Sequence, residues 1–411
     1  MSRLLPVVFL LQKALLMCSF GFFRFFNSKG GRRRTIDWVV GTNEIASVLF
    51  RISQALPRSY SVSFTSGDAY NFSYDYRLAT GGTPRARAIR RLIVGPVLLG
   101  RLANQARGFL YVGATGFLLE SLDQREFEFR FLNRRGLKIG IYWCGSEIRS
   151  TKIMHELERK MGLPNVSTYI GMVSPYFETT AHEQVQQRRA RVADTYADVM
   201  FDFPTDQASY LSRRREPYFY FMPTDRFVDD TDKFDDLSRI VITHATTSPM
   251  IKGTPLVRAA VARLRSEGYS FEYVELIGVS NAELLTELAR THIALNQFYG
   301  FTTTIFGIEA LASQCALLTS SDGTIETNLP PHANDAVMLT KHWQVYDNLK
   351  LLLDHPERIE ILAKAGQAWA KRYVSSAVTG PLLSGILDTV LNGSYRAEDR
   401  ARITTAQVYD G

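Results

Sequence analysis

The sequence predicts an α/β protein in which two Rossmann-like domains, each built on a doubly wound parallel sheet, face a cleft. At 411 residues the chain is longer than one ordinary core, since a domain typically holds roughly 100–200 residues. Hydrophobic residues make up 45% and charged residues 22%, which indicates a folded globular protein and excludes a disordered chain or a polytopic membrane protein. Apolar runs alternate with segments of helical periodicity in two separate series, as expected for two α/β domains.

The first series predicts an N-terminal domain over residues 35–222. Residues 36–40 form a short apolar run, a turn follows, and residues 45–56 have helical periodicity. Further strands are expected at residues 60–64, 108–111 and 137–143.

The second series predicts a C-terminal domain over residues 239–391, after a polar linker at 223–238. Its expected strands are 240–243, 271–276, 292–295 and 316–319, and its expected helices are 255–265, 282–289 and 305–311. Residues 392–411 are expected to form a polar tail. Because parallel sheets bind ligands at the carboxyl ends of their strands, the cleft between the domains is the expected site.

The first 34 residues predict a helix that lies on a membrane surface. Residues 4–26 are almost entirely apolar but contain Lys13 and Arg24, which disfavours a spanning helix. An interfacial helix would bury its aromatic residues in lipid and present the following basic cluster to anionic headgroups. The aromatic residues are Phe20, Phe22, Phe23, Phe25 and Phe26, and the basic cluster is Lys29, Arg32, Arg33 and Arg34. The alternative is a helix packed on the surface of the protein itself.

A second basic segment contributes to the net charge of +7. Arginines alternate with apolar residues between Arg85 and Arg107, which predicts an amphipathic helix broken near Gly95 and Pro96. Such a helix can rest on anionic lipid, and an ordinary core helix with solvated arginines explains the pattern equally well.

Metal-binding patterns are absent from the sequence. Cys18, Cys144 and Cys315 are far apart and lack metal-ligand spacing, so we expect a reducing compartment and no structural zinc. The acidic runs Asp229–Asp232 and Asp235–Asp236 lie in the polar linker and are interpreted as solvated charges. We therefore expect no essential metal.

One loop carries the residues expected to bind an anion. His244 ends a predicted strand, and Lys252-Gly253-Thr254 opens the following helix, whose dipole favours negative charge. This segment resembles the start of the C-terminal domain of family-4 (group 1) glycosyltransferases, which have the GT-B fold. The resemblance implies that Lys252 contacts the diphosphate of a nucleotide-sugar donor, and His244 would face the phosphate or the transferred sugar. The alternatives are a surface lysine and a structural histidine.

A second segment, residues 300–312, resembles the family pattern that ends in Glu-Ala-Met-Ala. The resemblance implies that Glu309 accepts hydrogen bonds from the ribose hydroxyls of the donor. Thr302, Thr303 and Thr304 would then receive phosphate oxygens at a helix N-terminus. The alternative is a plain N-cap at Thr304 and an exposed helical Glu309.

Two positions depart from the family pattern. The family has an arginine five residues before the lysine and a glutamate eight residues before the second glutamate, whereas this chain has Thr247 and Phe301. Without that arginine the donor diphosphate loses a bidentate partner, so either another arginine enters the site or Lys252 and the helix dipoles suffice. The retaining outcome typical of the family is an expectation under this resemblance.

The acceptor is expected to bind the N-terminal domain. Residues 142–149 follow a strand and resemble a His-Gly-Ser-Asp-x-Arg loop, with Cys144 in place of the histidine. The acceptor-side residues predicted from this loop and from the first strand-to-helix turn are Gly41, Thr42, Asn43, Gly145, Ser146, Glu147 and Arg149. A surface ion pair between Glu147 and Arg149 is the alternative.

These expectations describe a metal-independent, hexosyltransferase-like enzyme with no cofactor apart from its nucleotide-sugar substrate. The acceptor would be a glycan or a lipid-linked molecule in envelope polysaccharide or glycolipid synthesis, at the cytoplasmic face of the cell membrane, with no nucleic acid partner. The first alternative is another enzyme with two Rossmann-like domains, such as a sugar-nucleotide epimerase or a dehydrogenase. A dehydrogenase is disfavoured because only Gly41 stands where Gly-x-Gly-x-x-Gly is required. A catalytically inactive nucleotide-binding or membrane adaptor is the second alternative.

Overall fold

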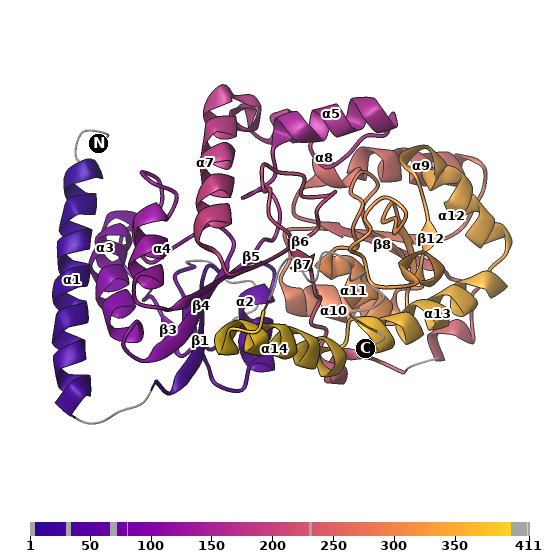
Figure 1. Ribbon diagram of the computed structural model, residues 1–411. Helices are drawn as coiled ribbons and strands as arrows, with labels where there is room; N and C mark the ends of the chain where they lie inside the picture. Colours follow the sequence, from indigo (N-terminus) through magenta and orange to yellow (C-terminus); the bar gives the residue numbers. More distant parts are fainter. Residues whose placement is uncertain are drawn as a thin grey trace.

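A computed structural model describes residues 5–29, 34–65, 72–79, 81–229, 232–395 and Tyr409. The chain forms two α/β domains that lie side by side, each around one parallel sheet (Figure 1). The fold class predicted from the sequence is confirmed.

The N-terminal domain has a seven-stranded sheet in the order β3-β2-β1-β4-β5-β6-β7, with every neighbouring pair parallel. Its strands are β1 (Ile36–Thr42), β2 (Ser59–Ser63), β3 (Tyr76–Arg77), β4 (Ala106–Val112), β5 (Lys138–Tyr142), β6 (Val199–Asp202) and β7 (Glu216–Pro217). Its helices are α1 (Leu5–Lys29), α2 (Val48–Ala55), α3 (Pro84–Leu102), α4 (Glu126–Asn133), α5 (Thr151–Met161), α6 (Ile170–Val173) and α7 (Thr180–Tyr196), with a 3₁₀ turn at Pro175–Glu178.

The C-terminal domain has a five-stranded parallel sheet in the order β12-β11-β10-β8-β9. Its strands are β8 (Val241–Thr246), β9 (Glu272–Ile277), β10 (Ile293–Leu295), β11 (Ala316–Thr319) and β12 (Met338–Leu339). Its helices are α8 (Pro249–Lys252), α9 (Thr254–Ser266), α10 (Asn281–Arg290), α11 (Ile305–Ala312), α12 (Val345–Asp354) and α13 (Glu357–Tyr373), and α14 (Ser376–Asn392) follows them. Its central strands are apolar and fully covered, as expected for a parallel sheet with helices on both faces.

The last helix crosses back to the N-terminal domain, although the sequence assigned residues up to 391 to the C-terminal one. Gly380 of α14 lies against Ala55 of α2, where an added Cβ would approach the Ala55 Cβ to 3.4 Å. Arg107 of β4 donates to the carbonyl of Leu391. Figure 1 shows α14 beside α2, below the larger sheet. The chain therefore passes between the domains at the linker and again before α14.

Helix α3 runs unbroken through Pro96, so the predicted break is wrong. A proline inside a helix leaves the carbonyl four residues earlier without its usual N–H partner. Here that carbonyl, of Leu92, accepts from Gln12 Nε2 of α1 at 3.1 Å. Gly95 lets the backbone approach the carbonyl of Phe117, which an added Cβ would meet at 2.0 Å. A neighbouring helix thus supplies the bond that the proline removes.

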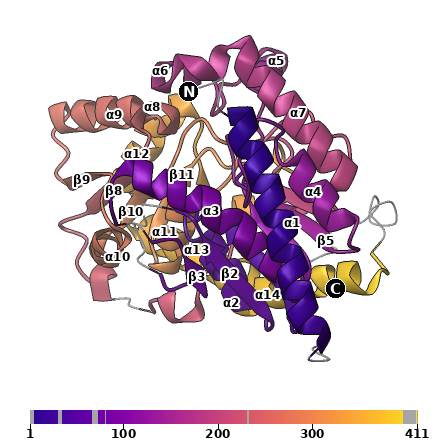
Figure 2. The same ribbon diagram turned by 90° about the vertical axis from the view of Figure 1, so that its left-hand side faces the viewer.

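Helix α1 packs along α3 by one face and exposes the other (Figure 2). On the packed face, Ser19 Oγ donates to the carbonyl of Val97, and the Phe20 ring meets Phe131 edge to face at 5.5 Å between centroids. Phe20 therefore belongs to the protein side of the helix, contrary to the sequence prediction. The outer face exposes large apolar side chains, namely Val7, Leu10, Leu11, Met17, Phe22, Phe25 and Phe26. By length and composition, Leu5–Phe26 could also cross a membrane.

Candidate functional site

A cleft of about 740 Å³ lies between the two domains, within the range of small-molecule sites. Side chains from loops that follow strands of both sheets line it. The N-terminal domain contributes Cys144, Gly145, Ser146 and Arg149 after β5 and Asp206 after β6, and the C-terminal domain contributes Thr247 and Lys252 after β8, Gln297 and Thr302–Thr304 after β10, and Glu309 of α11.

Lys252 brings a positive charge to this cleft at the end of α8. Its Nζ donates to Gln297 Oε1 at 2.5 Å. Partial burial lowers the pKa of the ammonium group to about 8, while the Asp206 carboxylate acts in the opposite direction. The next residue, Gly253, has a φ of 83°, which a side chain would strain, and it lets α9 begin directly after the lysine.

Three hydroxyl residues lie where α11 begins. Thr304 is the N-cap: its Oγ1 accepts from the Gly307 N–H at 3.3 Å and donates to Asn296 Oδ1 at 2.6 Å. Thr303 Oγ1 bonds to Ser321 Oγ at 2.9 Å. The free N–H groups and dipole of this helix start favour an anion in the adjoining cleft.

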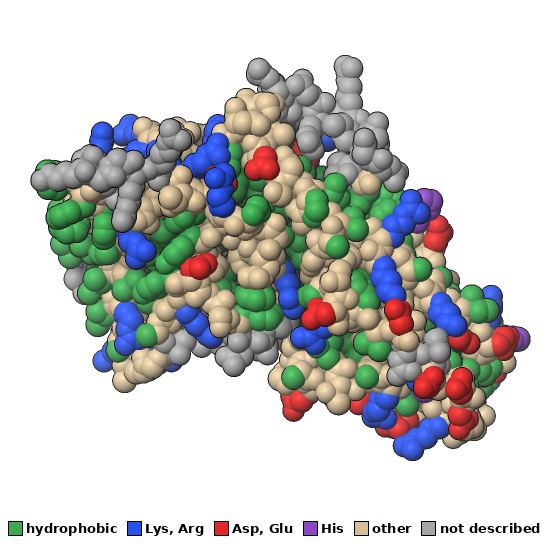
Figure 3. Space-filling view, turned by 90° about the horizontal axis from the view of Figure 1, so that it is seen from below, with side chains coloured by type: hydrophobic (Ala, Val, Ile, Leu, Met, Phe, Trp, Pro, Cys, Tyr) green, Lys and Arg blue, Asp and Glu red, His purple; other side chains and the backbone are tan. Residues whose placement is uncertain are grey.

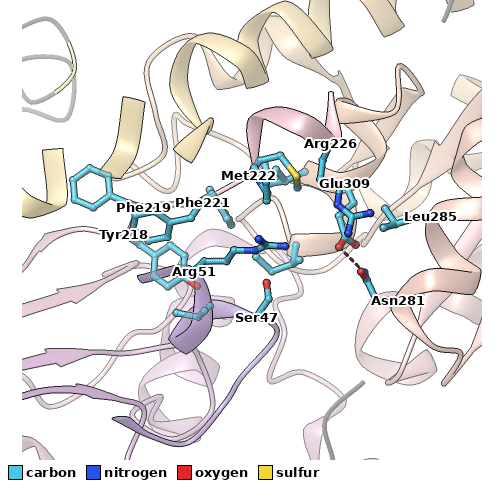
Figure 4. A pocket seen from close by; sticks show the side chains of 15 residues that line it. Ser47, Arg51, Tyr218, Phe219, Phe221, Met222, Arg226, Asn281, Leu285 and Glu309 are labelled. Atoms are coloured by element: carbon cyan, nitrogen blue, oxygen red, sulfur yellow. Dashed lines mark hydrogen bonds between the residues drawn. The ribbon is translucent and has the colours of Figure 1, made fainter. Parts of the chain in front are cut away.

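Glu309 lies within α11, the helix that follows these threonines, and is only 7% exposed. Asn281 Nδ2 donates to its Oε1 at 2.7 Å. Burial raises the pKa of the carboxyl to about 7, and the positive charges of Arg226 and Arg51 partly oppose that rise. Figure 4 shows Arg51 and Arg226 approaching from the N-terminal domain and the linker, next to the Glu309 and Asn281 pair. Glu309 and Lys252 thus share one cleft.

His244 does not face the cleft, which corrects the sequence prediction of a catalytic role. Its side chain is fully buried, with Nδ1 at 2.7 Å from the carbonyl of Leu295 and Nε2 at 2.8 Å from Thr254 Oγ1. Because a carbonyl can only accept, Nδ1 carries the proton and Nε2 accepts from the threonine hydroxyl. Burial lowers the pKa of this ring. His244 therefore fixes the start of α9 and has no ring nitrogen left for a ligand.

The predicted acceptor-side residues divide into two groups. Gly145, Ser146 and Arg149 line the cleft, whereas Glu147 turns back and accepts from the Cys144 N–H. Arg149 pairs with Asp206 rather than with Glu147.

Gly41, Thr42 and Asn43, at the end of β1, do not line the cleft. Thr42 is fully buried and donates to the carbonyl of Thr115 at 3.1 Å, and Asn43 Oδ1 accepts from Thr65 Oγ1 at 2.9 Å. Gly41 lies against the backbone of Val62. These three residues hold the carboxyl end of the inner strand β1 in place, and the apolar residues Ile45, Ala46 and Val48 line the cleft instead.

Phe301 occupies the position where the family pattern has a glutamate. Its side chain is 3% exposed and its N–H donates to Asp206 Oδ1 at 2.8 Å, across the domain boundary. Within the described ranges, no group of three or more His, Cys, Asp or Glu side chains is placed to hold a metal ion.

No family model and no curated protein matches the chain. Solved structures do match. The structure of sucrose-phosphate synthase from Thermosynechococcus elongatus shares 13% identity over 88% of this chain and 100% of that chain, with a TM-score of 0.58. The structure of WaaG, a glycosyltransferase involved in lipopolysaccharide biosynthesis, shares 10% identity over 85% of this chain and 100% of that chain, with a TM-score of 0.52.

The chain has the GT-B fold. At these identities the likeness establishes the fold alone, so the chemistry has to be argued from the side chains. In this GT-B structure the cleft between the domains contains Lys252, Thr302–Thr304 and Glu309, which come from two separate segments of the sequence.

Sequence reasoning missed several polar residues of the GT-B cleft. Asn281 and Gln297 orient Glu309 and Lys252, and Asp206 holds Arg149. Gln297 and Asp206 both follow buried strands, which is a usable signal. Strand β6, however, was not recognised, and Asn281 lies at the start of a helix where a polar residue is ordinary.

Proposed function

We propose that the chain is a glycosyltransferase that moves a sugar from a nucleotide-sugar donor to a glycan or a lipid-linked acceptor. One observation carries this proposal: an ammonium group, a helix start rich in hydroxyls, and a buried carboxyl line the same cleft of a GT-B fold. Lys252 and the N-terminus of α11 suit a diphosphate, and Glu309 suits the two hydroxyls of a ribose.

The proposed mechanism has no covalent intermediate. As the bond from the sugar to the diphosphate breaks, negative charge grows on the phosphate oxygens, and Lys252 with Thr302–Thr304 stabilises it. The acceptor hydroxyl bonds to the anomeric carbon on the face that the diphosphate leaves, and its proton passes to a departing phosphate oxygen. Glu309 holds the ribose, so the diphosphate stays in place. The Lys252 side chain supplies the positive charge without a metal ion, and the sugar is transferred with retention of configuration.

The test measures transfer and release of nucleoside diphosphate with a panel of uridine, guanosine and adenosine nucleotide-sugars. Lys252→Ala is expected to lower the transfer rate by about 10²–10³-fold, the usual effect of removing one group that stabilises transition-state charge. Glu309→Ala is expected to raise the KM for the donor. Arg159→Gln, at an exposed position of α5 outside the cleft, is the control and should leave both parameters unchanged.

Other outcomes would point to different functions. Full transfer activity in both cleft variants would contradict the proposal. Binding of the nucleotide-sugar without transfer or hydrolysis, whatever the acceptor, would indicate the inactive adaptor, for which the buried Phe301 and the replacement of a histidine by Cys144 are the motivating features. An isomerised nucleotide-sugar formed without acceptor would indicate an epimerase.

We also propose that the protein works on the cytoplasmic face of the cell membrane, held by the outer face of α1. Leu10, Leu11 and Phe26 of this face are 66%, 64% and 57% exposed, and Ile89 and Ile93 of α3 continue the apolar surface. Figure 3 shows hydrophobic side chains mixed with basic ones at this end of the molecule, whereas acidic side chains gather among basic ones at the other end. Apolar side chains flanked by cations suit an anionic bilayer surface. Lys29, Arg32 and Arg33, which would strengthen this charge, lie outside the part of the chain whose side chains are described.

Vesicle sedimentation tests the membrane proposal. A triple variant, Phe22→Ser with Phe25→Ser and Phe26→Ser, should bind anionic vesicles less tightly than the unchanged protein at low salt. Deleting the whole helix is a poorer test, because it would uncover the α3 face that α1 buries. Ile361→Ser, at a 67% exposed position of α13 in the other domain, is the control. Undiminished sedimentation of the triple variant would refute this membrane contact.

A further inference from the structure

We propose that Arg149 of the N-terminal domain, held by Asp206, is the second cation that binds the donor diphosphate, facing Lys252 of the C-terminal domain. This inference deepens the proposed function and depends on it. It also moves Arg149 from the acceptor side, where sequence reasoning placed it, to the donor side.

The geometry of the loops after β5 and β6 places Arg149 at the cleft. Its Nε donates to the Asp206 carbonyl at 2.6 Å, and its Nη2 lies 3.2 Å from Asp206 Oδ2. The Arg149 and Asp206 side chains are only 13% and 7% exposed. A guanidinium held in this way loses little conformational entropy on binding a ligand, because its two hydrogen bonds to Asp206 already fix its orientation.

Asp206 also ties this loop to the other domain. Its Oδ1 accepts the Phe301 N–H at 2.8 Å, and its own N–H donates to Glu326 Oε2 at 2.8 Å. The segment that positions Arg149 is therefore attached directly to the segment that leads into Thr302–Thr304. Arg149 of the N-terminal domain and the start of α11 in the C-terminal domain are therefore held in fixed positions on the two sides of the cleft.

The charges in the cleft leave room for an anion. Of the described side chains that line it, the basic ones are Arg149 and Lys252. The Arg149 charge contributes to lowering the pKa of Lys252, after the larger effect of burial, so the two cations interact electrostatically. The acidic side chains of the lining are Asp206, which pairs with Arg149, and Glu309, whereas Lys252 Nζ donates to the neutral Gln297. A diphosphate between the two cations would place negative charge beside the lysine. Thr247, where the family pattern has an arginine, cannot supply that charge, whereas Arg149 can.

A purely structural role for the Arg149 and Asp206 pair predicts a different ligand response. If Arg149 only fixes its loop, its loss should weaken all nucleotides by the same factor. If it binds the second phosphate, its loss should remove mainly the advantage that a nucleoside diphosphate has over the matching monophosphate.

Isothermal titration of the full chain with UDP, GDP and ADP and with UMP, GMP and AMP separates these readings. For the preferred base, Arg149→Gln should reduce the ratio of diphosphate to monophosphate affinity by about tenfold or more, since a charge-assisted bidentate contact is lost. Arg149→Lys should recover part of that ratio, because it restores the positive charge but not the paired N–H donors of the guanidinium. Arg159→Gln on α5 is the control and should leave the ratio unchanged.

The outcomes distinguish this inference from the proposed function. If the unchanged protein binds none of the six nucleotides, both fail. If it binds diphosphates and Lys252→Ala weakens them, while Arg149→Gln and Arg149→Lys keep the original ratio, the proposed function stands and the role of Arg149 is overturned. Circular dichroism of each variant shows whether it is folded, and the conservative Lys variant keeps the test decisive if the Gln variant is not.

Discussion

Lys252 and Glu309 both have pKa values displaced toward neutrality, in opposite directions and for the same reason. Burial disfavours the charged form of each, which lowers the pKa of the amine to about 8 and raises the pKa of the carboxyl to about 7. Such displaced values are characteristic of functional sites. Here they define the pH range in which Lys252 is positively charged, as binding of the diphosphate requires, while Glu309 is negatively charged, as binding of the ribose requires.

The dependence of kcat/KM for the donor on pH should therefore be bell-shaped, with its maximum between pH 7 and 8. As the pH falls through about 7, Glu309 becomes protonated and ceases to accept from both ribose hydroxyls. As it rises through about 8, Lys252 loses its charge. Steady-state kinetics should show that Glu309→Gln removes the acid limb. A profile that is flat from about pH 6 to about pH 9 would contradict these roles.

The Glu309 carboxyl should also make folding stability depend on pH. Its pKa in the folded protein, about 7, is above the usual 4.5, so its contribution to stability is fully present below pH 4.5 and is lost as the pH rises through 7. Glu309→Gln keeps the oxygen that Asn281 bonds and removes the buried charge. We expect it to raise the free energy of unfolding at pH 8 by about 1–3 kcal/mol while it weakens nucleotide binding. Chemical denaturation at pH 5 and pH 8 measures this, and equal effects at both pH values would count against it.

Part of the cleft could be predicted from sequence because local patterns carry it. Lys252 lies just before α9, Thr304 caps α11 and Glu309 lies within α11, and each belongs to a local motif that the sequence shows. His244 was misplaced because the residue that takes its second ring nitrogen, Thr254, is visible only once the loop has folded. The role of Asp206 depends on contacts with Phe301 and Glu326 in the other domain, and no local pattern encodes such contacts.

At the scale of elements, the sequence predicted long buried strands well and short strands poorly. The sequence predicted most strands of both sheets, because short apolar runs between turns suffice to identify buried parallel strands. It missed β6 and the very short β3, β7 and β12, where the apolar signal is brief. The sequence predicted a break in α3 at Pro96, because the hydrogen bond that compensates for the proline comes from Gln12, far away in the sequence.

Two helix caps give a matched comparison of structure and function. Thr304 caps α11 beside the cleft, and Ser280 caps α10 through a capping box outside the cleft lining. Replacing either by Ala should cost about 1 kcal/mol of stability. Only Thr304→Ala should also weaken nucleoside diphosphate binding, as measured by titration. Equal binding by the two variants would mean that the α11 start does not contact the ligand.

At the scale of the whole molecule, the two domains are joined by more than a linker. Met222 forms a parallel bridge with Ser375, α14 returns to α2, and the carboxylate of Glu326 accepts the N–H groups of Thr205 and Asp206, each at 2.8 Å. Burial raises the pKa of Glu326 to about 7. Contacts at several separate places thus hold the two domains in one relative position. This suits a cleft to which both domains contribute a cation.

Removing the Glu326 carboxyl should loosen this contact. Glu326→Ala leaves two N–H groups without their partner at the domain boundary and should cost about 1–3 kcal/mol of unfolding free energy. Glu326→Gln keeps an acceptor oxygen and should recover much of that loss. Small-angle scattering should report a larger radius of gyration for the Ala variant without ligand. An unchanged radius and unchanged stability would show that this contact does not hold the domains together.

The most direct test of the nucleotide site is a crystal structure of the full chain with the nucleoside diphosphate that binds best. We predict that the diphosphate lies within hydrogen-bonding distance of Lys252 Nζ and the start of α11, with the ribose hydroxyls on the Glu309 carboxylate. A nucleotide bound elsewhere, or bound in the cleft with its ribose away from Glu309, would contradict the account.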